Sequence, residues 1–104
     1  MDFKLIISDT ALAELGDAVV FIAENSYERA KKYENDVLDK LEKLEKDPYL
    51  GKPHPIDKLK KLGYRKLTVE SHTAHYLVDK DKKQIHVIRL LHSAMDEKKR
   101  LKDM

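Results

Sequence analysis

Residues 72–92 have the sequence HTAHYLVDKDKKQIHVIRLLH, in which a short polar segment separates two mainly apolar runs. The runs at 72–79 and 84–92 have the length and composition of β-strands. The DKDKK segment at 79–83 is typical of a surface turn. Two strands joined by a short polar turn predict an antiparallel hairpin. The second strand is apolar enough to occupy the centre of a sheet.

Two more strands are predicted outside this hairpin. Near the N-terminus, FKLII at 3–7 alternates in the manner of a short strand. Before the hairpin, YRKLTV at 64–69 alternates as well and places Arg65, Leu67 and Val69 on one face. The sheet is therefore expected to contain one strand from the start of the chain and three from its second half.

Two helices are predicted between these strands. Residues 8–10, Ser-Asp-Thr, are of the types that cap helix N-termini, and apolar residues then recur at steps of three and four. Asn25 precedes Glu28 by three residues, the spacing of a capping box, which predicts the start of a second helix. Prolines and a glycine in 48–55 end this helix in a loop. The two apolar stripes comprise Leu12, Leu15, Val19 and Ile22, then Ala30, Tyr33, Val37, Leu38, Leu41 and Leu44.

The pattern predicts a single α+β domain, residues 1–104, with an N-terminal strand, a two-helix hairpin packed on one face of a small antiparallel sheet, and a short C-terminal helical tail. The absence of cysteine excludes disulfides and thiol chemistry. The opening MDFKLIISD is too short for a signal peptide, and no apolar run approaches the roughly 20 residues of a membrane span. We therefore expect a cytoplasmic protein without membrane contact.

The two faces of the predicted sheet differ in what can cover them. Two helices cover only one face, so the other should be polar or basic, or should bind a partner. The segment 57–66 is rich in lysine and arginine and could hold phosphates beside this face. The alternative is a lysine-rich loop that is simply solvated. The net charge of +2 for the whole chain does not demand a nucleic-acid partner.

Histidines and one arginine are the candidates for chemistry. None of the five histidines has the spacing of a zinc site, and His72 and His75 should point to opposite faces of their strand. His92, at a strand end, could be a general acid or base in RNA cleavage, or could simply cap the sheet. Arg89 lies in an apolar strand and needs a partner. One alternative is an ion pair with a carboxylate, either that of Asp96 or one from a helix. The other is a bound ligand on the open face of the sheet.

The chain resembles the RelE/ParE superfamily of toxins from type II toxin–antitoxin systems. The resemblance lies in an ordered set of segments covering nearly the whole chain: LIISDTALAEL, VVFIAENSYERAKKYENDVLDKLEKLEKDPYLGKP, LGYRKLTVESHTAHYLVD and IHVIRLLHSAMD. It implies a helical hairpin against an antiparallel sheet, in agreement with the pattern above. The long helical pair and the DPYLGKP exit are more similar to the ParE branch.

The resemblance implies growth arrest through inhibition of DNA gyrase, with RelE-like cleavage of mRNA on the ribosome as the alternative. It also implies a cognate antitoxin as partner and DNA contact only through that antitoxin. No cofactor or metal is expected. The implied target-binding residues are Arg65, Lys66, Arg89, His92 and Ala94. In the ribonuclease alternative, His92 would be the acid or base, and Arg65 and Arg89 would stabilise the phosphate charge.

The chain departs from the family pattern in two places. Ala94 stands where members with a His-x-Arg-x-Asp ending have arginine. Natural drift or a deliberate detoxifying change would explain it, and an inactive relic that only binds antitoxin is a third interpretation. His72 and Thr73 stand where RelE-type nucleases often have a Tyr-Arg pair. This second departure favours the ParE branch.

Overall fold

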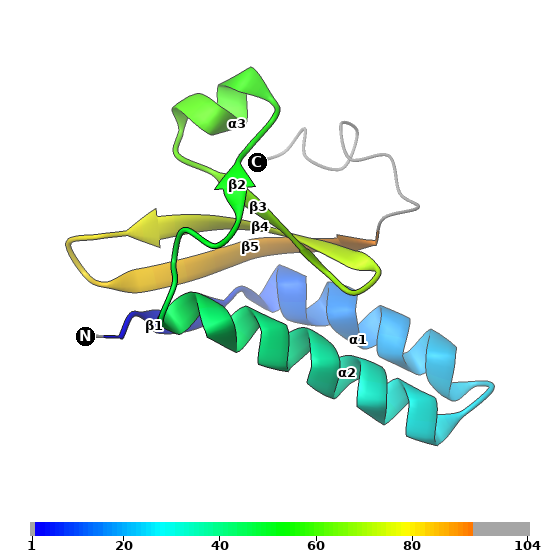
Figure 1. Ribbon diagram of the computed structural model, residues 1–104. Coiled ribbons are helices and arrows are strands. Elements are labelled where there is room, and N and C mark those ends of the chain that lie inside the picture. The colour runs from blue at the N-terminus through cyan, green and yellow to red at the C-terminus, as the bar shows by residue number, and fades with distance from the viewer. Residues whose placement is uncertain (1, 93–104) are drawn as a thin grey trace.

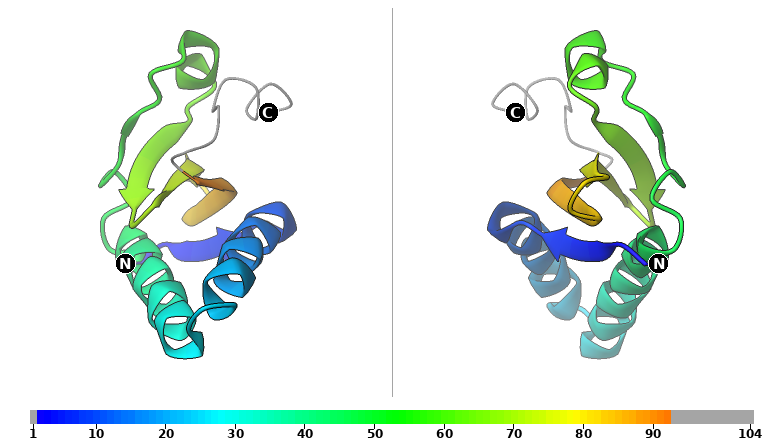
Figure 2. Two further views of the ribbon diagram at one scale, coloured as in Figure 1. Left: turned by 90° about the vertical axis from the view of Figure 1, so that its right-hand side faces the viewer. Right: turned by 90° about the vertical axis from the view of Figure 1, so that its left-hand side faces the viewer.

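The computed structural model describes residues 2–92 and contains a five-stranded sheet with strand order β1-β5-β4-β3-β2. Two long helices lie on one side of this sheet, and a short helix lies on the other (Figures 1 and 2). The elements are β1 (Lys4–Ile7), α1 (Asp9–Ala23), α2 (Tyr27–Glu42), the 3-10 helix η1 (Lys43–Glu45), β2 (Lys52–Pro53), α3 (Asp57–Lys61), β3 (Arg65–Val69), β4 (His72–Asp79) and β5 (Gln84–His92).

The predicted α+β architecture is confirmed, and the sheet is mixed rather than wholly antiparallel. Strands β2 to β5 pair antiparallel, including the predicted hairpin of β4 and β5. Strand β1 pairs parallel with β5, with Leu5 opposite Ile85. Two parallel strands need a long crossover connection, and the segment from α1 to β4 forms this connection here. The short sequence of β1 carried no sign of this direction. The predicted C-terminal helical tail lies outside the described residues.

The helix starts follow the predicted cap chemistry at one helix but not at the other. Ser8 caps α1, and its Oγ accepts a hydrogen bond from the Ala11 N–H. At α2 the cap is Ser26, whose Oγ accepts from the Arg29 N–H, so the prediction of Asn25 as the cap was wrong. Ser26 has the extended backbone that an N-cap requires, with φ −159° and ψ 112°.

The core fills the space between the two long helices and the sheet. Leu15 of α1 and the α2 residues Val37 and Leu41 are buried against it, and Ile85 and Val87 of β5 are fully buried from the sheet side. These apolar stripes stabilise the helices mainly through tertiary packing, since single helices of this length are marginal in water.

The opposite face of the sheet is partly covered by the chain itself. The segment after Pro48, predicted as a loop, contains β2 and α3 and folds over this face (Figure 1). Leu59 of α3 packs against Leu91 of β5, and both are buried. The expectation that this face stays polar, basic or partner-bound was therefore wrong for the part beneath α3. A five-residue helix has too little pattern to be recognised among lysines and prolines.

Candidate functional site

A groove with a volume of about 700 Å³ lies between α1, α2 and the ends of β4 and β5 that adjoin them. Most of its wall is apolar, and charged side chains lie around it. Its lining includes the α1 residues Glu14, Asp17, Ala18, Phe21 and Ile22, the α2 residues Arg29, Lys32, Tyr33 and Asp36, and the sheet residues Ser71, His72, Leu90 and His92. A mainly apolar groove of this size is suited to binding a partner.

The polar part of the groove is a hydrogen-bonded chain between α2 and β4. The Ser71 N–H donates to Tyr33 Oη at 3.2 Å, so the Tyr33 hydroxyl proton is free to donate to His72 Nδ1 at 2.5 Å. Burial lowers the pKa of His72, and the nearby His92 lowers it further. Burial also raises the pKa of Tyr33. Burial thus favours the neutral form of both side chains.

His92 closes the sheet end of the groove. It lies directly opposite His72 in the β4–β5 ladder, and the two rings meet edge to face with centroids 5.4 Å apart. The side chain of His92 is exposed at the last described residue of β5. The ring of His92 therefore faces a second histidine.

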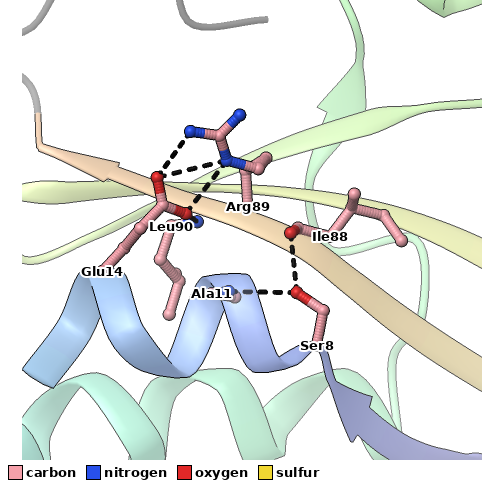
Figure 3. Close-up of polar contacts among 6 residues, drawn as sticks. All are labelled: Ser8, Ala11, Glu14, Ile88, Arg89 and Leu90. Carbon is pink, nitrogen blue, oxygen red and sulfur yellow. Dashed lines mark hydrogen bonds and ion pairs between the residues drawn. The ribbon is translucent and has the colours of Figure 1, made fainter. Parts of the chain in front are cut away.

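Arg89 has its partner on a helix, which was one of the alternatives from the sequence. Its Nη2 lies 2.7 Å from Glu14 Oε2 and its Nε donates to both carboxylate oxygens at 3.1 Å. Figure 3 shows the Glu14 side chain rising from α1 to meet Arg89 at the strand. The guanidinium of Arg89 is therefore engaged within the protein.

Beyond the end of β1, the Glu14 carboxylate also accepts a hydrogen bond from the backbone of β5. Glu14 Oε1 accepts from the Leu90 N–H at 3.0 Å, and Ser8 Oγ donates to the Ile88 carbonyl at 2.7 Å (Figure 3). Because β1 pairs only with residues 84–87, these side chains take the place of a strand there. They fix α1 against β5 and so set one wall of the groove.

Arg65 lies far along the sheet from His92 and holds a loop. Its Nη2 donates to the Gly51 carbonyl at 2.5 Å and to the Tyr49 carbonyl at 3.3 Å. Its guanidinium also stacks over the Tyr49 ring at 5.1 Å. These contacts fix the chain between α2 and β2.

The proposed catalytic residues are not brought together. Arg65 lies opposite Tyr76, whereas Arg89 lies opposite His75. Since Tyr76 packs in the core beneath the helices and His75 packs against His54 on the other side, the two arginines belong to opposite faces of the sheet. Lys66 shares the face of Arg89 and lies opposite both Lys52 and His75. Ala94 and Asp96 lie outside the described residues.

Glu14 and Tyr33 were not identified as site residues from the sequence. Both belong to helices whose outer faces carry many charges, so nothing local distinguished Glu14 from its neighbours. Tyr33 was placed in the apolar stripe of its helix, and only the pairing with His72 gives its hydroxyl a role. The one available signal was the position of Arg89 in an apolar strand, because a guanidinium there requires a partner such as a carboxylate.

Two negative findings apply to residues 2–92 alone. None of the helices there is long and apolar enough to cross a membrane. In the same residues, no cluster of three or more histidine, aspartate or glutamate side chains is arranged to hold a metal ion.

The chain matches the family model described as ParE toxin of type II toxin–antitoxin system, parDE, over residues 5–97. It is also similar to two solved structures. One is the chromosomal ParDE toxin–antitoxin system from P. aeruginosa, with 24% identity, TM-score 0.68, and coverage of 86% of this chain and 95% of that one. The other is the RelBE2 toxin–antitoxin complex from Mycobacterium tuberculosis, with 14% identity, TM-score 0.59, and coverage of 88% and 99%. No curated protein matches the chain.

Proposed function

Because the chain belongs to the ParE toxin family of type II toxin–antitoxin systems, we propose that it acts in the bacterial cytoplasm and arrests growth by inhibiting DNA gyrase. It would do so as a binding inhibitor, without catalytic residues. The observation that carries the proposal is the match to the ParE model over residues 5–97. The resemblance noted in the sequence pointed to the same branch.

The site geometry gives the ribonuclease alternative less support. A phosphate-cleaving site needs its acid or base and its cationic groups around one reacting atom. Here Arg65 holds backbone carbonyls on the face beneath the helices, and Arg89 is bound to Glu14. Of these three candidate catalytic residues, only His92 lines the groove.

We propose that the stretch 89–102 carries the contacts to the target, with Arg65 and Lys66 as further candidates.

Position 94 belongs to this proposed target surface. We expect an arginine there to contact an acidic or phosphate-bearing target, which alanine cannot do. The test is bacterial growth after induction of the native chain and of Ala94→Arg, without antitoxin. Arrest by the arginine form alone would identify the native chain as a disarmed toxin. Arrest by both would place the active surface elsewhere, and arrest by neither would favour the relic.

The cognate antitoxin is the partner of the chain as a type II toxin, and we propose that the groove between α1 and α2 receives it. An apolar segment of the antitoxin would cover the apolar wall, including Phe21, whose side chain is 69% exposed in the free toxin. Asp17 and Arg29 at the groove offer one charge of each sign to the polar face of that segment. Burial of this surface would supply the affinity.

A matched pair of variants tests the groove. Phe21→Glu places a charge in the groove, whereas Leu62→Glu changes a similarly exposed leucine, 58% exposed, that does not line it. Both side chains are largely solvent-exposed, so neither change should unfold the protein. Calorimetric titration with the cognate antitoxin should show at least about tenfold weaker binding for Phe21→Glu, which corresponds to about 1.4 kcal/mol. Equal losses for both variants would contradict the proposed location.

A further inference from the structure

Two histidines form a fully buried pair on the face of the sheet opposite the groove. His54 lies between β2 and α3, and His75 lies in β4; neither has any exposed surface. Their rings are 5.1 Å apart between centroids, and His54 Nε2 lies 3.0 Å from His75 Nδ1. A fully buried imidazole pair is an unusual means of attaching a surface segment to a sheet.

The hydrogen bonds of this pair fix where its protons lie. The Ile56 N–H donates to His54 Nδ1 at 3.1 Å, so the proton of neutral His54 must sit on Nε2. From there it donates to His75 Nδ1. A proton added to His54 Nδ1 would meet the hydrogen of the Ile56 N–H and break that hydrogen bond. A proton added to His75 Nδ1 would likewise meet the hydrogen on His54 Nε2. The closed arrangement therefore requires both rings to be neutral.

The charges around the pair also oppose protonation. Lys66 of β3 and Arg89 of β5 lie directly opposite His75 on its two neighbouring strands. Arg89 is partly compensated by Glu14 from α1. The charged residues on the elements adjoining the pair are Lys52 on β2, Arg65 and Lys66 on β3, Asp57, Lys58, Lys60 and Lys61 on α3, Asp79 on β4 and Arg89 on β5, with the Arg65 side chain on the opposite face of the sheet. Cations thus outnumber carboxylates on these elements.

Within residues 2–92, the backbone hydrogen bonds of the segment held by this pair are mainly internal to it. Residues 54–64, which we call the flap, bond mainly to themselves, with His54 N–H donating to the Tyr64 carbonyl and Tyr64 N–H to the Leu59 carbonyl. The flap contributes Leu59 to a small apolar cluster with Leu91, flanked by Ile56 and Tyr64. Figure 2 shows it standing apart from the layer of α1 and α2. A segment with so small a cluster can open without unfolding the main core.

We propose that His54 and His75 form a proton-sensitive latch, so that acidification opens the flap from the sheet while the core beneath α1 and α2 stays folded. Opening hydrates both rings and lets each take up a proton. It also uncovers His75 and Leu91 on a face that already carries Lys66 and Arg89. The opened face is therefore cationic and suited to an anionic partner. This inference does not depend on the proposed function, since it concerns the other face of the sheet.

The size of the effect follows from proton linkage. A hydrated imidazole titrates near pH 6.5, and the open flap binds two protons that the closed flap excludes. Between pH 7.5 and pH 5.5 the opening equilibrium should then rise about 100-fold. With one histidine of the pair removed, the rise should be about tenfold.

The test is amide hydrogen exchange of the full chain, followed by NMR at pH 7.5 and pH 5.5. Protection of the Ile56 amide, which donates to His54 Nδ1, should fall about 100-fold after correction for intrinsic rates. The amide of Leu15, in the core of α1, should remain better protected at both pH values. Protection of the flap amides that equals that of Leu15 at both pH values would overturn the latch, because the flap would then open only by global unfolding.

A double variant separates the two histidines from other effects of pH. In His54→Gln with His75→Asn, an amide N–H can still donate to an amide oxygen, but neither group titrates. The drop in flap protection should then largely disappear, whereas His86→Gln, which changes a histidine bound to Gln84 on β5, should retain it. A drop that persists in the double variant would overturn the proposal. If the double variant does not fold, titration of the His54 and His75 rings near pH 6.5 in the native chain, with the flap amides still protected, would overturn it equally.

Discussion

Replacing Glu14 with alanine should be among the most destabilising single changes on α1. The Glu14 carboxylate accepts hydrogen bonds from the Arg89 guanidinium and from the Leu90 N–H. The two side chains of the ion pair are only 20% and 17% exposed, so solvent cannot replace the lost partner well. Breaking a buried pair costs about 3–5 kcal/mol, and partial exposure places this one near the lower end, at about 3 kcal/mol. At roughly 4–8 °C per kcal/mol for a domain of this size, the Tm should fall by about 12–24 °C.

Urea unfolding of Glu14→Ala, followed by circular dichroism, measures this loss directly. The matched control is Asp36→Ala, which breaks the exposed pair with Lys32, whose side chains are 38% and 77% exposed. Such exposed pairs contribute little to stability, because water and salt screen the two charges. A double-mutant cycle with Arg89→Met should give a coupling of at least about 1 kcal/mol. The reasoning is refuted if Glu14→Ala costs no more than Asp36→Ala, or if the coupling is close to zero.

Four further substitutions have expected outcomes of known sign. Gly51→Ala should lower the free energy of unfolding by at least about 2 kcal/mol, because its Cβ would lie 2.6 Å from a backbone oxygen and 2.7 Å from Tyr76 Oη. Gly16→Ala should raise the free energy of unfolding by about 0.5–1 kcal/mol, because its Cβ would have no atom within 4 Å and alanine favours the helix. Urea titrations of the two variants that show the same sign would be inconsistent with this packing. Tyr76→Phe should lose about 1–3 kcal/mol in the same assay, since its buried hydroxyl makes two backbone hydrogen bonds; a loss below about 0.5 kcal/mol would mean that the hydroxyl is dispensable. Burial, and then His92, lower the pKa of His72 in the folded protein. As the pH falls below about 6.5, His72 therefore takes up a proton in the unfolded chain before it does so in the folded one. The free energy of unfolding should be constant above this pH and should fall below it. His72→Gln should reduce the fall measured between pH 7.5 and pH 5.5, and an unchanged fall would argue against this assignment.

Much of the architecture could be predicted because each element carried its own local signal. The apolar composition of 84–92 and the polar turn before it specified the β4–β5 hairpin, and the Ser8 cap with the stripe after it specified α1. The α2 start was missed by one residue because Asn25 and Ser26 are both good caps, and only backbone geometry chooses between them. The parallel direction of β1 depends on where the chain returns, which a four-residue strand cannot encode.

The site was less predictable because its contacts join residues far apart in the chain. Arg89 could be recognised as needing a carboxylate, but Glu14 is 75 residues away and looks like any other surface acid. Tyr33 and His72 are 39 residues apart, and the pairing of His54 with His75 depends on a flap that had been predicted as loop. Placement of Arg65 and Arg89 on opposite faces follows from the register and an irregularity between His75 and Tyr76, which the alternation pattern did not reveal.

The supercoiling of relaxed plasmid by purified DNA gyrase tests the central claim most directly. The assay would include the native chain and Ala94→Arg, each with and without the cognate antitoxin, and a parallel translation reaction would be examined for new mRNA ends. We expect Ala94→Arg to inhibit supercoiling, antitoxin to restore it, and mRNA to remain intact. Full supercoiling with both forms, together with new mRNA ends during translation, would contradict the account and establish the ribonuclease alternative instead.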